Sequence, residues 1–168
     1  LGAEADDYFA ALAQPYVRGL RLNPRKPLAD PAALIEGLGE PVPWQPRTGR
    51  YLSQESTAGA QPLHEAGAYY IQEPSAMAAV AVLSPRPGER VLDLCAAPGG
   101  KSLMLGERLA GEGRLVAADR SERRQRQTAE NFRRRGLDYQ VTVADPAELT
   151  GEFDVVLADV PCSNTGVY

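Results

Sequence analysis

Two residues of reactive types, Asp159 and Cys162, stand three positions apart directly after the apolar stretch Phe153–Ala158. A thiolate attacks electron-poor carbon atoms. Carbon 5 of a pyrimidine is too weak a nucleophile to take a methyl group unaided, but a thiolate added at carbon 6 turns the ring into an enamine whose carbon 5 is nucleophilic. A cysteine beside a carboxylate and a methyl donor therefore predicts methylation of cytosine or uracil at carbon 5. The alternative is that Cys162 is a small buried residue of the core.

Another kind of methyl transfer fits this stretch less well. Enzymes that methylate exocyclic amines of bases often carry an aromatic residue here, after Asp-Pro-Pro or Asn-Pro-Pro, which stacks on the target base. This chain has Asp159-Val160-Pro161-Cys162 instead, and a thiol stacks poorly. Methylation of an amine or of a small molecule would leave the pairing of Asp159 with Cys162 unexplained.

A methyl donor needs a binding site, and a Gly-rich segment follows the expected strand Arg90–Leu94. Its small residues let the backbone approach a ligand, and the helix that it opens offers free N–H groups. It lacks the three spaced glycines of a dinucleotide site, and Cys95 replaces the first glycine that a phosphate-binding loop needs before Lys101-Ser102. The segment consists of Cys95, Ala96, Ala97, Pro98, Gly99, Gly100 and Lys101.

Acidic residues at two further strand ends suit the rest of such a ligand. Asp119 follows the expected strand Leu115–Ala118, where an acidic residue usually binds the hydroxyls of an adenosine ribose. Since no pyrophosphate-binding pattern is present, we expect an adenosine ligand without phosphates, and S-adenosylmethionine fits. Asp145, after the expected strand Tyr139–Ala144, is placed to meet the adenine edge. The alternatives are that Asp119 only caps the next helix and that Asp145 is a turn residue before Pro146.

Apolar strands alternate with helices in the second half of the chain, which predicts an α/β fold. Right-handed βαβ units give a doubly wound, mostly parallel, Rossmann-like sheet with helices on both faces, here truncated after its fourth strand. We expect the first and fourth strands to be neighbours, which would bring Cys95 and Cys162 close together as free thiols. The expected strands are Arg90–Leu94, Leu115–Ala118, Tyr139–Ala144 and Phe153–Ala158, with a helix at Ser121–Arg135 that stops at Gly136.

The proline-rich beginning predicts a small α+β lead-in region for RNA recognition over residues 1–67, ahead of the α/β domain over residues 68–168. The elements expected around this boundary are a strand at 17–23, a helix at Pro31–Leu38 capped by Asp30, a loop at 51–67, a strand at 68–72 and a helix at Pro74–Leu83.

The composition of the chain limits the ligands and the cellular location that we expect. The 168 residues carry a net charge of −4, two cysteines and one histidine. So few cysteines and histidines argue against a structural zinc site, and so few cysteines favour a reducing cytoplasm. No apolar run reaches the roughly 18 residues of a membrane span, and the acidic start lacks the basic region of a signal peptide. We expect a cytoplasmic monomer that binds neither metal nor membrane.

Four segments carry a resemblance to a known family. In sequence and in their order along the chain, they resemble the motifs of the RNA (cytosine-5)-methyltransferases of the NOL/NOP/Sun type, whose bacterial RsmB- and RsmF-like members modify small-subunit ribosomal RNA. The resemblance implies the fold of class I S-adenosylmethionine methyltransferases and the formation of 5-methylcytidine, with ribosomal RNA as the expected partner. The segments are Leu20–Asn23, Tyr70–Met77, Val91–Lys101 and Asp159–Val167.

The resemblance also implies a role for each matching residue. Cys95 to Lys101 would wrap the methionine and ribose parts of the cofactor, Asp119 would hold the ribose, Asp145 the adenine, and Asp159 would lie between cofactor and cytosine. In the family, a cysteine of a later Thr-Cys motif is the nucleophile, and the Pro-Cys thiol helps to release the product. In the DNA counterparts, the Pro-Cys thiol is itself the nucleophile. Cys162 is therefore expected to be catalytic in one of these two roles.

The 168 residues contain no Thr-Cys motif, and a full domain of this kind has about three more strands. We therefore expect this chain to bind the cofactor but not to complete a turnover by the family mechanism. A non-catalytic RNA-binding or ribosome-assembly module that keeps the cofactor fold is the competing hypothesis.

RNA must splay out its target base for such chemistry. Arg21 is the preferred RNA contact, because the resemblance places it in a family motif at the edge of the site. Arg25-Lys26 is a further candidate. So is the run Arg120–Arg135, with seven Arg against two Glu, although this run also fits a solvated helix face.

Overall fold

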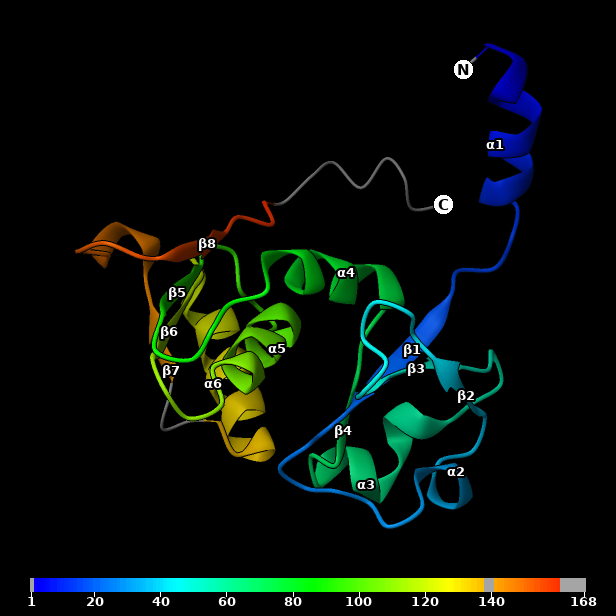
Figure 1. Cartoon of the computed structure of the whole chain (residues 1–168), viewed down its shortest axis with the longest axis horizontal. Helices are drawn as coiled ribbons and strands as arrows, with labels where there is room; N and C mark the ends of the chain where they lie inside the picture. Colours follow the sequence, from blue (N-terminus) through cyan, green and yellow to red (C-terminus); the bar gives the residue numbers. More distant parts are fainter. Residues whose placement is uncertain (1, 138–140, 161–168) are drawn as a thin grey trace.

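The computed structural model describes residues 2–137 and 141–160, and these form two four-stranded sheets (Figure 1). The first sheet is antiparallel with the order β2-β3-β1-β4, and the second is parallel with the order β7-β6-β5-β8. The helix α1 (Ala5–Leu12) stands apart from both sheets in Figure 1 and buries none of its residues. The expected α/β class with a small α+β region in front is confirmed.

The strands of the first sheet are β1 (Arg18–Leu22), β2 (Leu38–Pro41), β3 (Gly49–Leu52) and β4 (Tyr69–Ile71). β1 is central, because Leu20 lies opposite Arg50 of β3 on one side and opposite Ile71 of β4 on the other. The strand β4 therefore belongs to this first sheet, although the sequence places it just inside the second region.

The two faces of β1 point to different partners, as the alternation of a strand requires. Leu20 packs into a buried cluster with Ile35, Leu52 and Tyr69. The opposite face points toward the second sheet and its helices: a Cβ on Gly19 would lie 2.9 Å from Cγ of Pro74, the first residue of α4 (Pro74–Leu83).

The structure corrects the sequence-based elements in this half. Asp30 accepts hydrogen bonds from the N–H groups of Ala32 and Ala33 as expected of an N-cap, but the helix α2 (Pro31–Leu34) is shorter than predicted. Ile35 has an extended backbone, with φ −122°, and its side chain is buried in the cluster with Leu20. The helix therefore ends before this residue. The expected loop 51–67 contains the end of β3 and a short helix, α3 (Pro62–Glu65).

The second sheet follows the sequence-based expectation closely. Its strands β5 (Arg90–Asp93) and β8 (Val155–Leu157), the first and fourth of this half, are neighbours, with Leu92 opposite Val156. On the other side β5 pairs with β6 (Arg114–Ala118), which pairs with β7 (Val141–Ala144). All four strands are parallel, so their carboxyl ends meet at one edge of the sheet.

The helices α5 (Gly100–Arg108) and α6 (Glu122–Arg135) connect β5 to β6 and β6 to β7. Because both right-handed crossovers step in the same direction, they place their helices on the same face of the sheet. Helices were expected on both faces, but within the described residues the two crossover helices cover one face. Ser121 is the N-cap of α6, and Gly136 ends it with φ +75°. The helices α4 and α5 enclose a core on this face, whose buried members include Met77, Val80, Val91, Met104, Leu105, Leu109 and Leu115. No helix in residues 2–137 or 141–160 has the length and apolarity to cross a bilayer.

Candidate functional site

A cavity of about 720 Å³ opens at the carboxyl ends of β5, β6 and β8. Its volume lies in the range of small-molecule sites, about 300–1,000 Å³. Four of the residues singled out in the sequence, Cys95, Ala97, Asp119 and Asp159, line it together. Among the described residues, the lining consists of Leu94, Cys95, Ala97, Asp119, Arg120, Ser121, Arg124, Pro146, Asp159 and Val160.

The Gly-rich segment forms a tight turn between β5 and α5. The N–H of Ala96 donates to the carbonyl of Ala118 at 2.8 Å, which ties the turn to the end of β6, and the N–H of Gly99 donates back to Ala96 at 2.7 Å. Gly99 has φ +103°, a conformation that side chains disfavour, and a Cβ there would lie 3.2 Å from Thr128 of α6. The helix α5 then starts at Gly100, so its free N–H groups point toward this end of the sheet.

Lys101 connects this turn to the residue that follows β8. Its Nζ lies 2.6 Å from Oδ2 of Asp159. Both side chains are partly exposed, at 23% for Lys101 and 55% for Asp159. The ion pair therefore holds the Asp159 carboxylate beside the Gly-rich turn while leaving it accessible.

Asp119 is a buried carboxylate in the cavity wall, only 7% exposed. One oxygen accepts the N–H of Ser121 at 2.9 Å, and the other lies 3.3 Å from Nη1 of Arg124. The N-cap of α6 is Ser121, so capping does not account for this carboxylate.

Arg124, in the first turn of α6, also donates from Nη2 to the carbonyl of Ala97 at 2.7 Å. It therefore connects Asp119 with the Gly-rich turn. The sequence analysis interpreted the Arg-rich run as an RNA surface or a solvated helix face. The position of Arg124, five residues after the strand-end Asp119, was the available signal for its place in the cavity.

Asp145 lies at the end of β7 and caps a short turn, Pro146–Glu148: its Oδ1 accepts the N–H of Ala147 at 2.8 Å. The cavity lining includes Pro146 rather than Asp145. The turn geometry that the sequence offered as the alternative for Asp145 is therefore present in the structure.

Asp93, at the end of β5, is a feature that sequence reasoning missed. It is buried and accepts a hydrogen bond from the hydroxyl of Ser102 at 2.5 Å. Burial raises the pKa of the Asp93 carboxyl, while hydrogen bonds from Ser102 and from the N–H of Cys95 act in the opposite direction. Its Oδ1 has no hydrogen-bond partner among the described atoms. An aspartate inside an apolar strand, Val-Leu-Asp-Leu, was the signal for it.

Arg21, the preferred RNA contact, is in a different environment from the one expected. Its side chain is fully buried. It donates to Gln72, to Glu107 and to the carbonyl of Gly100. An RNA phosphate cannot reach this guanidinium without rearrangement of the fold. Cys95 is a free, half-buried thiol, and Cys162 lies outside the described residues, so its distance from Cys95 or Asp159 stays a prediction.

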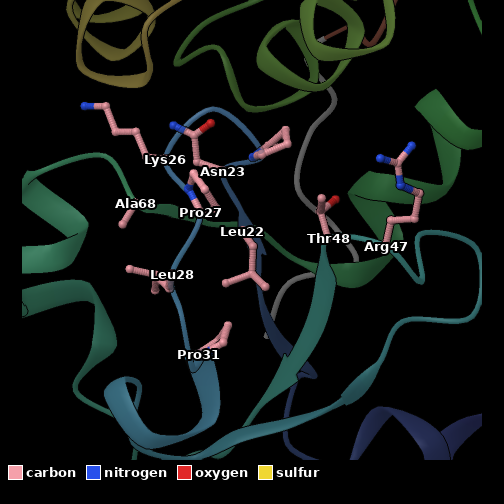
Figure 2. Close-up of a pocket in the computed structure, with 10 residues that line it drawn as sticks. Leu22, Asn23, Lys26, Pro27, Leu28, Pro31, Arg47, Thr48 and Ala68 are labelled. Carbon is pink, nitrogen blue, oxygen red and sulfur yellow. The ribbon is translucent and has the colours of Figure 1, made fainter.

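A second cavity, of about 200 Å³, lies beside β1 in the first half of the chain. Figure 2 shows its lining of aliphatic and proline residues, with Asn23, Lys26, Arg47 and Thr48 as the polar members. It is smaller, carries no carboxylate and is remote from the strand ends, so the larger cavity is the candidate site. In the two described stretches, no group of three or more His, Cys, Asp or Glu residues could hold a metal ion.

The parallel sheet with a Gly-rich turn after β5 and a strand-end aspartate after β6 has the fold of class I methyltransferases. Within that class, residues 80–168 match the model of the 16S rRNA methyltransferase RsmB/F, and residues 1–74 match the N-terminal domain of 16S rRNA methyltransferase RsmF. The chain belongs to the RsmB/F family.

Curated relatives agree with this assignment. The chain is 38% identical to the ribosomal RNA small subunit methyltransferase B of Erwinia tasmaniensis, with 80% of this chain and 33% of that protein covered. It is 35% identical to the ribosomal RNA small subunit methyltransferase F of Klebsiella pneumoniae over 96% and 37% of the two chains. It is also 34% identical to the tRNA (cytosine(49)-C(5))-methyltransferase of Pyrococcus abyssi over 98% and 55%. The chain thus spans between a third and about half of the length of these relatives.

Two solved structures from Pyrococcus horikoshii are similar. A methyltransferase homolog superimposes with a TM-score of 0.79 at 31% identity, over 96% of this chain and 56% of the other. The structure of NSun6 with SFG, an analogue of S-adenosylmethionine, gives a TM-score of 0.58 at 29% identity, over 67% and 33%.

Proposed function

We propose that the protein is an S-adenosylmethionine-dependent RNA methyltransferase that forms 5-methylcytidine in small-subunit ribosomal RNA. The observation that carries the proposal is the shared cavity of the Gly-rich turn, Asp119 and Asp159. It puts groups suited to an adenosine-containing methyl donor beside a carboxylate at the tip of β8.

The cavity fits S-adenosylmethionine in size and in chemistry. Asp119 would accept hydrogen bonds from the ribose hydroxyls, and Asp145 would meet the adenine. The turn from Cys95 to Lys101 (Cys95, Ala96, Ala97, Pro98, Gly99, Gly100 and Lys101) would hold the methionine part, since its backbone N–H groups face the ligand end of the sheet. The cofactor supplies an electrophilic methyl group there. Arg124 would orient Asp119 through its 3.3 Å contact.

Asp159 and Cys162 would act on the cytosine. The thiolate of a cysteine adds to carbon 6, carbon 5 takes the methyl group, and loss of the carbon 5 proton then expels the thiolate and restores the ring. Cys162 would serve either as this nucleophile or in release of the product. Asp159, held by Lys101, would bind and orient the base between the thiol and the methyl donor.

Ribosomal RNA is the favoured substrate because both matching family models describe 16S rRNA methyltransferases. A transfer RNA is the second candidate, favoured by the similarity to the Pyrococcus abyssi enzyme over 98% of the chain. We place this activity in the cytoplasm, in a monomer.

Bisulfite sequencing of total RNA from cells with and without the gene tests the proposal. We expect one cytosine of the small-subunit ribosomal RNA to lose its protection in the deletion strain. A plasmid copy should restore it, and a copy with Asp159→Asn should not. Loss of protection in a transfer RNA would move the substrate to the second candidate, and an unchanged pattern in all RNA would contradict the function.

A further inference from the structure

One face of the strand β1 is polar and points toward the second sheet. Arg21 and Asn23 stand two residues apart, on the same face of the chain as Gly19. Arg21 is fully buried and donates from Nε to Oε1 of Gln72 at 3.0 Å. Its Nη1 donates to Glu107 of α5, and its Nη2 lies 3.4 Å from the carbonyl oxygen of Gly100.

Gly100 is the residue at which the Gly-rich turn, called the cofactor turn below, ends and the helix α5 begins. On its other side, the ring of Tyr70 from β4 stands where a side chain would be: a Cβ on Gly100 would lie 3.0 Å from Tyr70 Cε1. Tyr70 and Gln72 both belong to the strand region that pairs with β1. The first sheet therefore contacts the cofactor turn through Arg21 on one hand and Tyr70 on the other.

The segment that follows β1 also holds the end of α6. The carbonyls in the last turn of a helix have no partner inside the helix. Asn23 donates to the carbonyl of Arg135 at 3.1 Å, and Lys26 donates to that of Arg134 at 2.8 Å. Figure 2 shows Asn23 and Lys26 on the segment that follows β1. Arg135, also fully buried, donates to the second oxygen of Glu107 at 3.0 Å.

Two buried guanidinium groups thus share the Glu107 carboxylate, an arrangement with a high desolvation cost. Burial lowers the pKa of Arg135 to about 10. Stability alone is a weak reason for such a network, because apolar residues of similar size often replace buried ion pairs without loss. The contact of Arg21 with Gly100 points to a second role for this network, at the cofactor turn.

We propose that Arg21 is a positioning residue for the cofactor turn: it fixes the carbonyl of Gly100 and, through Glu107, the axis of α5. This inference rests on the proposed function in one respect, that the turn holds the methionine part of the cofactor. The first sheet then acts as a rigid support for the cofactor site, and the arginine of the Leu-Arg-Leu-Asn segment acts on the cofactor side.

Calorimetry with two ligands tests this role. S-adenosylhomocysteine carries the amino-acid part that the turn would hold, and 5′-methylthioadenosine lacks it while keeping the adenosine that Asp119 would hold. Arg21→Met should weaken the binding of S-adenosylhomocysteine about tenfold, the size expected from the loss of one hydrogen bond, and leave that of 5′-methylthioadenosine nearly unchanged. Arg18→Met is the control on the same strand, since among the described residues the Arg18 side chain donates to the carbonyls of Ser53 and Gln54 in the first half, and it should change neither affinity.

The possible results distinguish a failure of the proposed function from a failure of the positioning role of Arg21. Wild-type protein that binds neither ligand would contradict the proposed function. Wild-type binding with an equal loss of both ligands in Arg21→Met, or no loss, would overturn the positioning role. Arg21→Lys keeps the charge without the fork-shaped guanidinium, and Glu107→Gln keeps the side-chain shape. If Arg21→Met does not fold, these two variants should show the same selective loss, and its absence in both would overturn the role.

Discussion

The ammonium group of Lys101 lies 2.6 Å from the carboxylate of Asp159, and this pair joins the first turn of α5 to the end of β8. Lys101 belongs to the turn that would hold the methyl donor, and Asp159 to the segment that would hold the base. The ion pair is thus the shortest described connection between the two halves of the proposed reaction site.

This geometry predicts that Lys101→Met lowers methyl transfer far more than it lowers stability. Partly exposed ion pairs contribute about 0–1 kcal/mol to folding, so the free energy of unfolding should change little. The rate should fall because Asp159 loses its orientation. Bisulfite sequencing of RNA from cells that carry the wild-type or the variant gene measures methyl transfer, and denaturant unfolding measures the free energy of unfolding.

A matched control for this variant is Glu122→Gln, which removes the exposed pair of Arg126 with Glu122, 2.8 Å apart on α6, and keeps the arginine. Glu122→Gln should leave methyl transfer unchanged. Equal rates for Lys101→Met and the wild type would show that the ion pair has no part in the reaction.

Arg124→Met should weaken the binding of S-adenosylhomocysteine about tenfold, because it removes the partner of Asp119 and the hydrogen bond to Ala97. Arg123→Met, at an exposed position of the same helix outside the cavity lining, is the control. Calorimetry measures both, and equal affinities for the two variants would refute the assignment of Arg124 to the cavity wall.

Asp93 predicts a pH dependence of stability. Burial raises its pKa above the usual 3.8, so the folded protein holds this proton more tightly than the unfolded chain does. The contribution of Asp93 to the free energy of unfolding is therefore greatest at low pH, and it falls as the pH rises from 3.8 through the raised folded-state pKa. Asp93→Asn cannot ionise, so the difference between wild type and variant should turn against the wild type over this window and then level off. Denaturant unfolding at a series of pH values measures it, and a difference that does not vary with pH would contradict the buried, ionisable carboxyl.

Gly67 marks the close approach of the first half of the chain to α6. It has φ +74°, and a Cβ there would lie 2.2 Å from the carbonyl oxygen of Arg134. Gly88 has φ +91° but open space around it, so Gly88→Ala adds only backbone strain, about 1–3 kcal/mol. Gly67→Ala should cost more than Gly88→Ala in denaturant unfolding, because it also displaces the end of α6. Equal costs would show that the two parts do not meet closely there.

The sequence was most informative where local pattern and tertiary role agree. The strands and the helix ends of the second half, including Ser121 and Gly136, lie within a residue or two of their expected positions in the described range. Four apolar strands that alternate with capped helices leave few topologies open, and the right-handed crossover fixes the order of neighbours.

The first half was harder to predict for physical reasons. The strands β2 and β3 are short, and the pairing of β3 with the central strand β1 is long-range. Arg21 was expected to contact RNA because the family resemblance places it in a motif at the edge of the site. Here the polar face of β1 is covered by the second half of the chain, and no local pattern encodes a buried guanidinium whose partners lie 51 and 86 residues away.

The central claim is that the cavity at the ends of β5, β6 and β8 holds S-adenosylmethionine through Asp119. Titration calorimetry of S-adenosylhomocysteine into wild-type protein and into Asp119→Ala tests it most directly. We expect one ligand bound per wild-type chain and a loss of about 1–3 kcal/mol in the variant, the usual cost of leaving buried polar groups without partners. Equal affinity of the two proteins for this ligand would contradict the claim.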